Sequence, residues 1–507
     1  MRAAPIVALI VLLAGISSRE LPAAEYYVDS KQGDDTHDGH TPGTAWRSIE
    51  QVNRTTFQPA DRILLAAGSK WEDVTLQPRG SGTEGRPIVV DRYGDGAKPA
   101  LHGRGRVETC LRLENVSYWE VRNIEITNHS DSGPRDLRGV EVRAEDTGVM
   151  RHIYLHGLDV HRINAVSDYK SDGSTHSKSF GGMFTIISGS NKQTAWDDLR
   201  IEQCAIYDVG PIGMAMLSTW MSGHRENDPE TWFPSQNVVI RDNRFQHIAR
   251  NGLIVRGCSK PLIEKNFFKE CGYDGSGNAC FSFQCDDALF QFNESCFTKY
   301  NQGDTDATGF DSDYNCRRSV FQYNYSHDNE YGFFVACSQG PKGFNEGTIA
   351  RYNISQNDGG NVFRFSGNIT NTEVYNNTIY VSRKMINPVE GAPPRIVYCK
   401  SWKGWSDSLK FHDNVIINLS KNAVYAEGKS TNNEFLHNLF FGIHPPSEPN
   451  DPQKLLTNPM LVRLGGAKLG LASAIDAYSP KPGAPQVGAG AAIRLKAEEI
   501  GILAPIK

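Results

Sequence analysis

Residues 309–316 contain a pair of acidic side chains whose spacing suits chemistry. Asp311 and Asp313 alternate with residues that include Phe310 and Tyr314. In a β-strand this alternation places both carboxylates on one face and the two aromatic rings on the other. The backbones of the two aspartates are then about 6.6 Å apart, so their carboxylates can share a substrate or a cation. The alternative is a solvated acidic strand that performs no chemistry.

A sequence repeat predicts the element that positions this strand. Short segments of alternating apolar residues each end in an asparagine, at spacings of 23 to 37 residues: Asn243, Asn266, Asn293, Asn324, Asn353, Asn377, Asn414 and Asn438. Such periods are typical of solenoids, whereas a propeller needs four strands per blade. No repeat shows the 3.6-residue apolar period of a helix. The sequence therefore predicts an all-β parallel β-helix of roughly ten coils, with an N-terminal cap and an irregular C-terminal tail.

The repeated asparagine has a predicted role in the stack of coils. Asn tolerates left-handed backbone angles, and its side-chain amide can bond to the asparagine of the next coil. We therefore expect one ladder of Asn side chains at the same turn of every coil. Stacking the coils then aligns the strand positions before each Asn turn as successive rungs: residues 252–256, 280–284, 310–313, 333–336 and 362–364.

The N-terminus has the features of an export signal. Arg2 is followed by an apolar run over residues 6–14 and by small residues before Glu25. The run is too short to span a bilayer but suits a signal peptide, the alternative being an anchored N-terminal helix. We expect a secreted or periplasmic protein with four parts: a signal peptide (1–24), an N-terminal cap with the first coils (25–117), the β-helix (118–464) and a capping tail (465–507).

Composition narrows the range of partners. The chain of 507 residues has 53 Lys and Arg against 58 Asp and Glu, a net charge of −5 that favours neither nucleic acid nor an anionic membrane surface. Ten cysteines fit either disulfides in an oxidising compartment or free thiols stacked in the core. No CxxC pair or Cys/His cluster has zinc spacing, so we expect no structural metal. We expect a monomer.

The chain resembles the right-handed parallel β-helix proteins of the pectate-lyase-like superfamily. The resemblance rests on the opening Tyr27-Val-Asp with Trp46-Arg-Ser-Ile, on Gly80-Ser-Gly-Thr with Pro87-Ile, and on the coils that end in Asn. It covers essentially the whole mature chain. It implies a right-handed helix and a secreted carbohydrate-active enzyme, in most cases a polysaccharide lyase or a glycoside hydrolase and in a minority an epimerase.

Two reactions fit a groove with paired acids. Hydrolysis of a glycosidic bond uses one carboxyl group as acid and another as base or nucleophile. For this reaction we expect Asp313 as base or nucleophile and either Asp311 or Glu330 as the acid. Substrate binding is assigned to residues on the same face or its loops: Arg256, Gln284, Arg364, His327, Trp220 and Trp232. Each tryptophan can either stack on a sugar or fold back over the solenoid.

The second reaction is β-elimination from a polyuronate, which uses a basic side chain and neutralises the uronate carboxylate with a cation. The calcium ligands would then be Asp286, Asp287, Asp311 and Asp313. Lyases of the superfamily typically carry Lys or Arg on this strand, and this chain has none in residues 310–314. We therefore favour a hydrolase that needs no cofactor, with a calcium-dependent lyase and a non-catalytic glycan-binding protein as alternatives. The substrate is expected to be a poly- or oligosaccharide.

Overall fold

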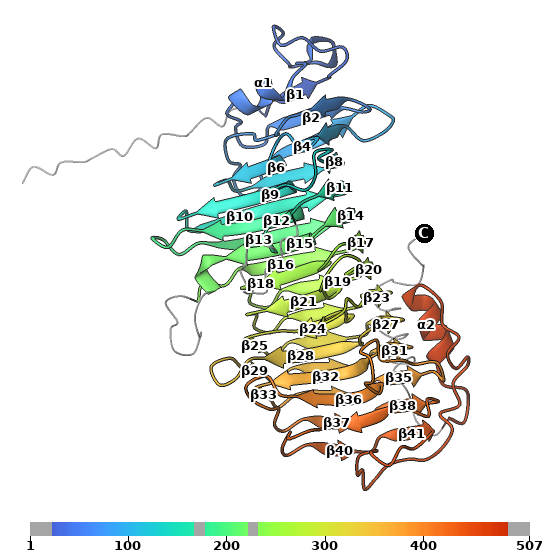
Figure 1. Ribbon diagram of the computed structural model, residues 1–507. Coiled ribbons are helices and arrows are strands. Elements are labelled where there is room, and N and C mark those ends of the chain that lie inside the picture. The colour runs from blue at the N-terminus through green and yellow to red at the C-terminus, as the bar shows by residue number, and fades with distance from the viewer. Residues whose placement is uncertain (1–22, 167–177, 222–231, 485–507) are drawn as a thin grey trace, which may run out of the picture.

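Short strands recur along the chain, and each pairs in parallel with the strand one coil before or after it (Figure 1). The computed structural model describes residues 23–166, 178–221 and 232–484. The predicted signal peptide up to residue 22, parts of two loop insertions and the end of the tail lie outside these residues. Within them, no helix is long and apolar enough to cross a membrane. The predicted parallel β-helix is confirmed.

Three large sheets form the sides of the solenoid. Sheet 1 has 14 strands, from β1 (Glu25–Val28) to β40 (Glu434–Leu436), and sheet 2 has 13, from β3 (Lys70–Glu72) to β41 (Leu439–Gly442). Sheet 3 has 11 strands. In chain order they are β6 (Thr109–Glu114), β9 (Arg138–Glu145), β12 (Gly181–Ser188), β15 (Ile212–Ser218), β18 (Leu253–Arg256), β21 (Cys280–Phe283), β24 (Phe310–Ser312), β28 (Phe334–Ser338), β32 (Asn361–Gly367), β36 (Arg395–Lys400) and β39 (Val424–Ala426).

A central coil shows the path of the chain. β26 (Val320–Gln322) of sheet 1 leads through a tight turn to β27 (Tyr325–His327) of sheet 2, and a longer turn leads to β28 of sheet 3. A fourth, three-stranded sheet begins with β25 (Cys316–Arg317) and returns the central coils to sheet 1. The predicted rungs are therefore neighbouring strands of sheet 3.

Asparagine side chains stack at the turn between sheets 1 and 2, as predicted. Each amide nitrogen donates to the side-chain oxygen of the next ladder residue at 2.9–3.0 Å, from Asn243 to Asn438, and Asp451 ends the ladder. The prediction that these asparagines adopt left-handed angles is wrong. Instead, the residue before each ladder asparagine has a positive φ, as at Tyr323 with 56°. The turn needs one residue with a positive φ, and the asparagine that follows it directs its side chain into the stack.

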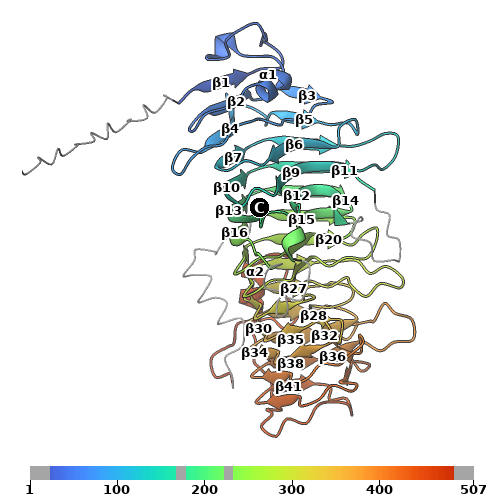
Figure 2. The ribbon, with the colours of Figure 1, turned by 90° about the vertical axis from the view of Figure 1, so that its left-hand side faces the viewer.

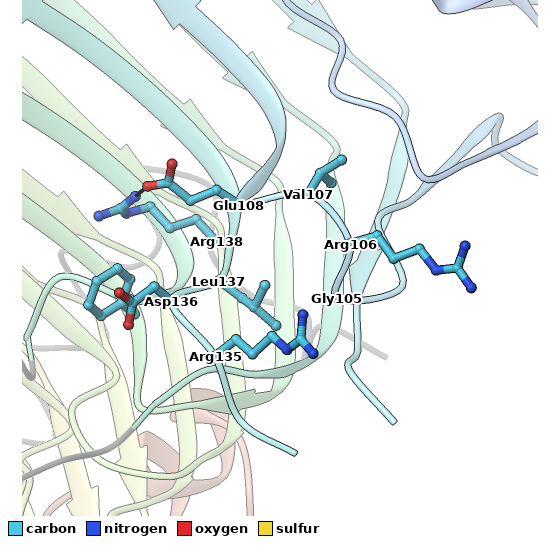
Figure 3. A pocket seen from close by; sticks show the side chains of 9 residues that line it. Gly105, Arg106, Val107, Glu108, Arg135, Asp136, Leu137 and Arg138 are labelled. Atoms are coloured by element: carbon cyan, nitrogen blue, oxygen red, sulfur yellow. Dashed lines mark hydrogen bonds and ion pairs between the residues drawn. The ribbon is translucent and has the colours of Figure 1, made fainter. Parts of the chain in front are cut away.

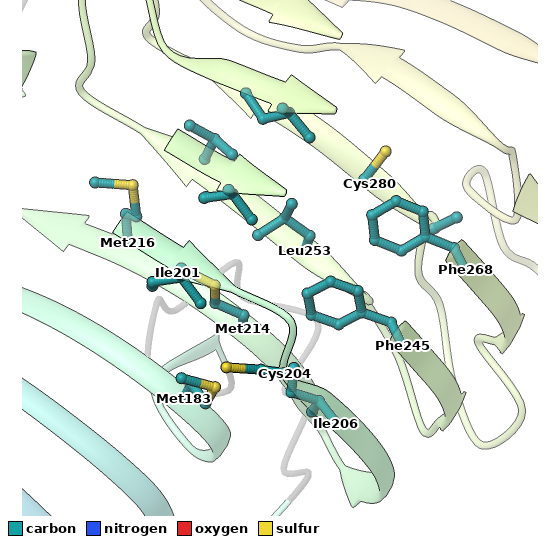
Figure 4. Packing of buried hydrophobic residues seen from close by; sticks show 14 of the residues in the cluster. Met183, Ile201, Cys204, Ile206, Met214, Met216, Phe245, Leu253, Phe268 and Cys280 are labelled. Carbon is teal, nitrogen blue, oxygen red and sulfur yellow. The ribbon is translucent and has the colours of Figure 1, made fainter. Parts of the chain in front are cut away.

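The interior is filled by side chains that stack on their equivalents in neighbouring coils. Phe245 and Phe268, on successive strands of sheet 2, have ring centroids 4.9 Å apart and an interplanar angle of 12°. Met183, Met214 and Leu253 pack near them (Figure 4). All ten cysteines are buried thiols, and none of them forms a disulfide in this structure.

One helix covers the N-terminal end of the solenoid, and a second helix lies against its side. At the N-terminus, α1 (Ile49–Arg54) begins after Ser48, whose hydroxyl accepts from the Gln51 amide, and buries Ile49 and Val52. The C-terminal tail is more regular than predicted, since it contains the helix α2 (Leu471–Tyr478). Figure 1 shows α2 beside the sheet 2 strands β27, β31 (Ile354–Gln356) and β35 (Thr378–Val381). The turned view in Figure 2 shows the same coils stacked along one axis.

Candidate active site

The outward face of sheet 3 carries the paired aspartates. Strand register places Asp311 of β24 opposite Phe281 in the preceding coil and Val335 in the following one, with Arg364 one coil further. Phe310 points into the core and is fully buried. Asp311 therefore belongs to a column of outward side chains, as the alternation predicts.

A second column begins two residues further along each strand. Arg256 lies opposite Phe283, and Cys337 opposite Ser366. Asp313 follows β24 and donates its amide to the Ser282 carbonyl at 2.9 Å, which places it between them. The prediction that Tyr314 lies on the face of Phe310 is wrong. β24 ends at Ser312, and the Tyr314 ring instead stacks on Phe283 with centroids 5.8 Å apart.

The two carboxylates share their site with a thiol. One oxygen from Asp311, one from Asp313 and the Cys337 sulfur all lie within 4.8 Å of one another. The Cys337 Sγ–H donates to Asp313 Oδ1 at 3.1 Å and lies 3.8 Å from Asp311 Oδ1. The Asn278 amide donates to Asp311 Oδ2 at 2.9 Å. Asp311 is 3% exposed, whereas Asp313 is partly exposed and is the more accessible of the two.

Burial and charge repulsion both favour a bound proton at this pair. Burial raises the pKa of Asp311 well above its usual range, and the negative charges of Asp313 and Asp306 raise it further. Burial also raises the pKa of Asp313, although Lys178 and the Cys337 thiol oppose that rise. Two adjacent acids cannot both ionise easily, so one of them keeps its proton into a higher pH range. Asp311 is the more buried and the natural holder of this proton.

Basic side chains flank the acids along the same face. Burial lowers the pKa of Arg256 to about 10, partly offset by Asp313, and its guanidinium lies 5.0 Å from the centre of the Phe283 ring. The Arg364 guanidinium lies 5.6 Å from the Tyr331 ring. Both arginines have a buried Nε with no hydrogen-bond partner among the residues that the structure describes. Arg256 and Arg364 are thus placed as predicted, with donor capacity left for a ligand.

Two further aspartates approach the site from the turn that precedes β24. Ser276 lies within hydrogen-bond distance of both Asp304 and Asp306, and the Asp306 amide donates to Asp304 Oδ1 at 2.7 Å. Burial and the charge of Asp306 raise the pKa of Asp304. The roles of Asp304, Asp306 and Asn278 were not predicted. These residues lie in turns whose length differs from coil to coil, so the strand register does not show where their side chains lie. The only signal was the local density of aspartates between residues 304 and 313.

Glu330, one of the two predicted acids, lies apart from the aspartates. It sits in the turn between β27 and β28 and pairs with the Lys299 ammonium at 2.8 Å. Its second oxygen accepts the Tyr300 amide, also at 2.8 Å. It lines a cavity of about 510 Å³ together with Met385 and Pro388. Both oxygens of Glu330 are thus occupied by partners other than the acid pair.

His327 lies on sheet 2, on a different side of the solenoid. Its ring nitrogens are 2.8 Å from Asp328 and 3.2 Å from Glu294. Burial alone lowers the pKa of His327, but its bonds with Asp328, Cys296 and Glu294 outweigh this and raise it to about 11. The structure does not bring His327 to the acid pair, because His327 lies on β27 of sheet 2 and not in a loop beside the outward face of sheet 3.

Of the other predicted binding residues, Gln284 and Trp220 follow sheet 3 strands, whereas Trp232 precedes β16 (Gln236–Arg241) of sheet 1. Gln284 follows β21, is buried and donates its amide to the Tyr314 carbonyl at 2.8 Å. Trp220, in the short 3₁₀ helix η3 (Thr219–Met221), is partly buried and packs against the main core. Trp232 is partly exposed, and the residue after it bonds back to the Trp220 carbonyl. The fold-back alternative therefore describes Trp220.

The alternative calcium site is not assembled. Asp287 pairs with the Arg318 guanidinium at 2.7 and 3.0 Å, and Asp286 lies in the turn that leaves β21. Neither joins Asp311 and Asp313, whose third close neighbour is the Cys337 thiol. Calcium prefers six to eight oxygen ligands, so two carboxylates and a thiol do not fit it.

A second cavity lies on the same side of the solenoid, near β6 and β9. It has a volume of about 540 Å³, and its lining includes Arg135, Arg138 and Glu108 (Figure 3). Arg138 pairs with Glu108 at 2.5 Å and with the fully buried Glu141 at 3.1 Å. Strand register places Glu141 five strands from Asp311, about 24 Å at roughly 4.8 Å per strand. This cavity is therefore separate from the acid pair.

Known proteins share this fold. No protein-family profile matches the chain. A lacto-N-biosidase of Bifidobacterium longum subsp. longum is 24% identical over 92% of this chain, and the chain spans 34% of the length of that relative. A GH136 lacto-N-biosidase from Eubacterium ramulus superposes with a TM-score of 0.63 at 22% identity, covering 77% of this chain and 67% of that one. Its native crystal structure gives 0.62 at 24% identity, with coverages of 72% and 65%. The solved structures confirm the parallel β-helix.

Proposed function

We propose that the protein hydrolyses glycosidic bonds of a poly- or oligosaccharide at the outward face of sheet 3. The observation that carries this proposal is the contact between Asp311 and Asp313, whose carboxylates lie within 4.8 Å and both have raised pKa values. Glycosidases need one carboxylic acid that is protonated and one carboxylate beside it. Asp311 is the more buried of the two and suits the protonated acid, whereas Asp313 is the more accessible and suits the carboxylate.

Asp311 is the proton donor in this proposal, and Asp313 is the nucleophile. Retaining glycosidases have carboxyl groups about 5–5.5 Å apart, and inverting ones about 6.5–9.5 Å. The separation here favours retention: Asp313 attacks the anomeric carbon while Asp311 protonates the departing oxygen. Asp311 then takes a proton from the water that releases the sugar from Asp313. The Cys337 thiol, which donates to Asp313, orients the attacking carboxylate.

The arginines on either side supply substrate contacts. Arg256 is two coils before Asp313 along the second column, and Arg364 is two coils after Asp311 along the first. Their guanidinium groups can donate to sugar hydroxyls or to a carboxylate on the substrate. The relatives support the choice of substrate to test first, since both bear the name lacto-N-biosidase. Oligosaccharides that carry lacto-N-biose are therefore the primary candidates.

Elimination is a second candidate because of one observation. Arg256 is buried beside Asp313 with a pKa lowered to about 10, and a lyase could use such a side chain as its base. Against this, the acids offer no oxygen cage for calcium.

One assay separates the two reactions. The purified protein is incubated with lacto-N-biose-containing oligosaccharides and with polyuronates, and the products are examined for reducing ends and for the ultraviolet absorbance of an unsaturated sugar. We expect new reducing ends without that absorbance, and their loss in Asp311→Asn. Unsaturated products would assign elimination. Binding without any cleavage would support the glycan-binding alternative.

A further inference from the structure

Three potential metal ligands meet on the outward face of sheet 2, away from the acid pair. Glu294 and Cys296 lie on β23 (Glu294–Cys296), and His327 lies opposite Cys296 on β27 of the next coil. One carboxylate oxygen, the sulfur and a ring nitrogen all lie within 4.8 Å of one another. The three residues are 7%, 0% and 2% exposed, respectively. A nitrogen, a sulfur and an oxygen donor thus converge in a buried place.

Neighbouring groups fix two of these side chains in the way that metal ligands are usually fixed. Asp328 lies 2.8 Å from the His327 Nδ1, so the Nε2 side of the ring faces Glu294. The Gly470 amide donates to both oxygens of Glu294 at 2.9 and 3.1 Å. Metal-bound histidines almost always donate their other ring N–H to a carboxylate or carbonyl, and bound carboxylates are themselves hydrogen-bonded.

The Nε2 atom of His327 and a carboxylate oxygen of Glu294 lie close enough together to share one cation. With the Nδ1 proton directed at Asp328, a neutral ring presents the Nε2 lone pair to a carboxylate oxygen 3.2 Å away. Either a proton on Nε2 or a cation between the two acceptors removes this repulsion. Tetrahedral zinc, with bonds of about 2.0–2.3 Å, holds its donor atoms roughly 3.3–3.7 Å apart, slightly more than the 3.2 Å of this contact. The same cation would also be within reach of the Cys296 sulfur, which lies within 4.8 Å of both atoms.

We propose that Glu294, Cys296 and His327 bind a divalent transition-metal cation, with Zn²⁺ the best match to their donor set. The cation would fasten the segment before α2 to sheet 2, because Gly470 is bonded to one of its ligands. The spacing of the ligands does not resemble a zinc motif, since His327 enters from the next coil. The site lies on sheet 2 and Asp311 lies on sheet 3, so the test of metal binding does not depend on whether the protein hydrolyses glycosidic bonds.

Metal binding by the full-length protein tests this proposal directly. Chelator-treated protein is titrated with Co²⁺, and a zinc-loaded sample is measured by X-ray absorption at the zinc edge. We expect one equivalent of cobalt with a thiolate-to-cobalt charge-transfer band, and a zinc shell that contains one sulfur. Failure of the folded wild-type protein to bind cobalt, or a shell without sulfur, would overturn the site.

Variants locate the bound metal. Cys296→Ser should abolish the charge-transfer band, and Asp328→Asn should weaken binding by about 10–100-fold. The matched control is His412→Asn, because His412 has the same 2.8 Å contact with its following aspartate but no thiol beside it; it should leave binding unchanged. Cys337→Ser should also leave the band unchanged. If Cys337→Ser removes the band, or if folded Cys296→Ser keeps it, the metal binds elsewhere and the proposal is wrong.

Discussion

At the scale of single residues, Asp311 and Asp313 oppose each other's ionisation inside a buried site. Among the described residues, Asp311 accepts hydrogen bonds from the Asn278 side-chain amide and from the distant Cys337 thiol. Asp313 accepts from the Tyr314 backbone amide and, at a shorter distance, from the same thiol. Hydrogen bonds to a carboxylate stabilise its charged form. The pair is therefore asymmetric, with Asp311 biased toward the acid and Asp313 toward the carboxylate.

Replacing either aspartate should abolish turnover without unfolding the protein. We expect Asp311→Asn and Asp313→Asn each to lower kcat by roughly 10²–10⁴-fold, the usual contribution of a positioned acid or base. Loss in Asp311→Asn should be smallest on substrates with a good leaving group, which needs no proton. Steady-state kinetics with activated and natural glycosides checks this, alongside circular dichroism of each variant.

Chemical rescue distinguishes Asp313 from the nearby Asp306 as nucleophile. Azide should restore turnover to Asp313→Gly, giving a glycosyl azide of the opposite anomeric configuration, because the small anion replaces the missing carboxylate in a retaining reaction. Asp306→Gly serves as the matched control and should not respond. Rescue of Asp306→Gly in place of Asp313→Gly would transfer the role to the loop aspartate.

The raised pKa of Asp311 also predicts a stability effect with a definite sign. The folded state binds the Asp311 proton more tightly than the unfolded chain does, so the wild-type protein loses stability as pH rises above the unfolded pKa of about 3.9. An asparagine side chain at this position carries no charge at any pH. Asp311→Asn should therefore be more stable than wild type at pH 7, with the difference vanishing near pH 4. Urea unfolding at both pH values measures it; equal gaps at the two values would contradict the assignment.

Much of this site was predictable from residue alternation alone. Asp311, Asp313, Arg256 and Arg364 were found because strands of a solenoid share one register. Cys337 was missed because a cysteine in a strand resembles any small core residue. Glu330 and His327 were misplaced relative to the acids, since sequence does not show which of two neighbouring turns or sheets a side chain faces.

At the scale of elements, the asparagine ladder is the feature that links one coil to the next. The Asn324 amide donates to the Phe290 carbonyl and to Asn353 Oδ1, both at 3.0 Å, and its oxygen accepts both the backbone and the side-chain amide of Asn293. All of these groups are buried. One side chain therefore bonds to polar groups of both neighbouring coils.

Removing one ladder side chain should cost more than removing a surface asparagine. Asn324→Ala leaves the Asn293 donors and the Phe290 carbonyl buried without partners, and each such group costs about 1–3 kcal/mol. We expect a loss of roughly 2–5 kcal/mol in the free energy of unfolding, measured in urea. Asn422→Ala, at an exposed position, is the control and should change little. Equal effects would mean that the ladder contributes no more than a surface residue.

At the scale of the whole molecule, different sheets serve different purposes. Sheet 3 presents the acid pair outward, whereas the outward face of sheet 2 is covered by the C-terminal segment. Leu471, Ile475 and Tyr478 of α2 join a buried cluster with Tyr325 and Ile354 of sheet 2. Tyr478 also donates to Gln356 at 2.8 Å. The sequence repeat predicted the solenoid, but it did not predict that α2 packs on sheet 2. A helix of eight residues depends on tertiary packing, and its segment has no period to reveal it.

A charge under α2 should therefore loosen the tail and leave the site on sheet 3 active. Ile475 is 4% exposed, so Ile475→Asp must either bury an unpaired carboxylate or detach the helix. Coils of a solenoid contact mainly their neighbours, so the damage should remain local. We expect faster proteolysis near α2, a lower Tm, and kcat within about twofold of wild type at low temperature, where a twofold change is roughly 0.4 kcal/mol. Ala472→Asp, at a partly exposed position of the same helix, controls for the added charge. A large loss of kcat in folded Ile475→Asp would contradict this prediction, because it would show that the packing of α2 on sheet 2 affects the acid pair on sheet 3.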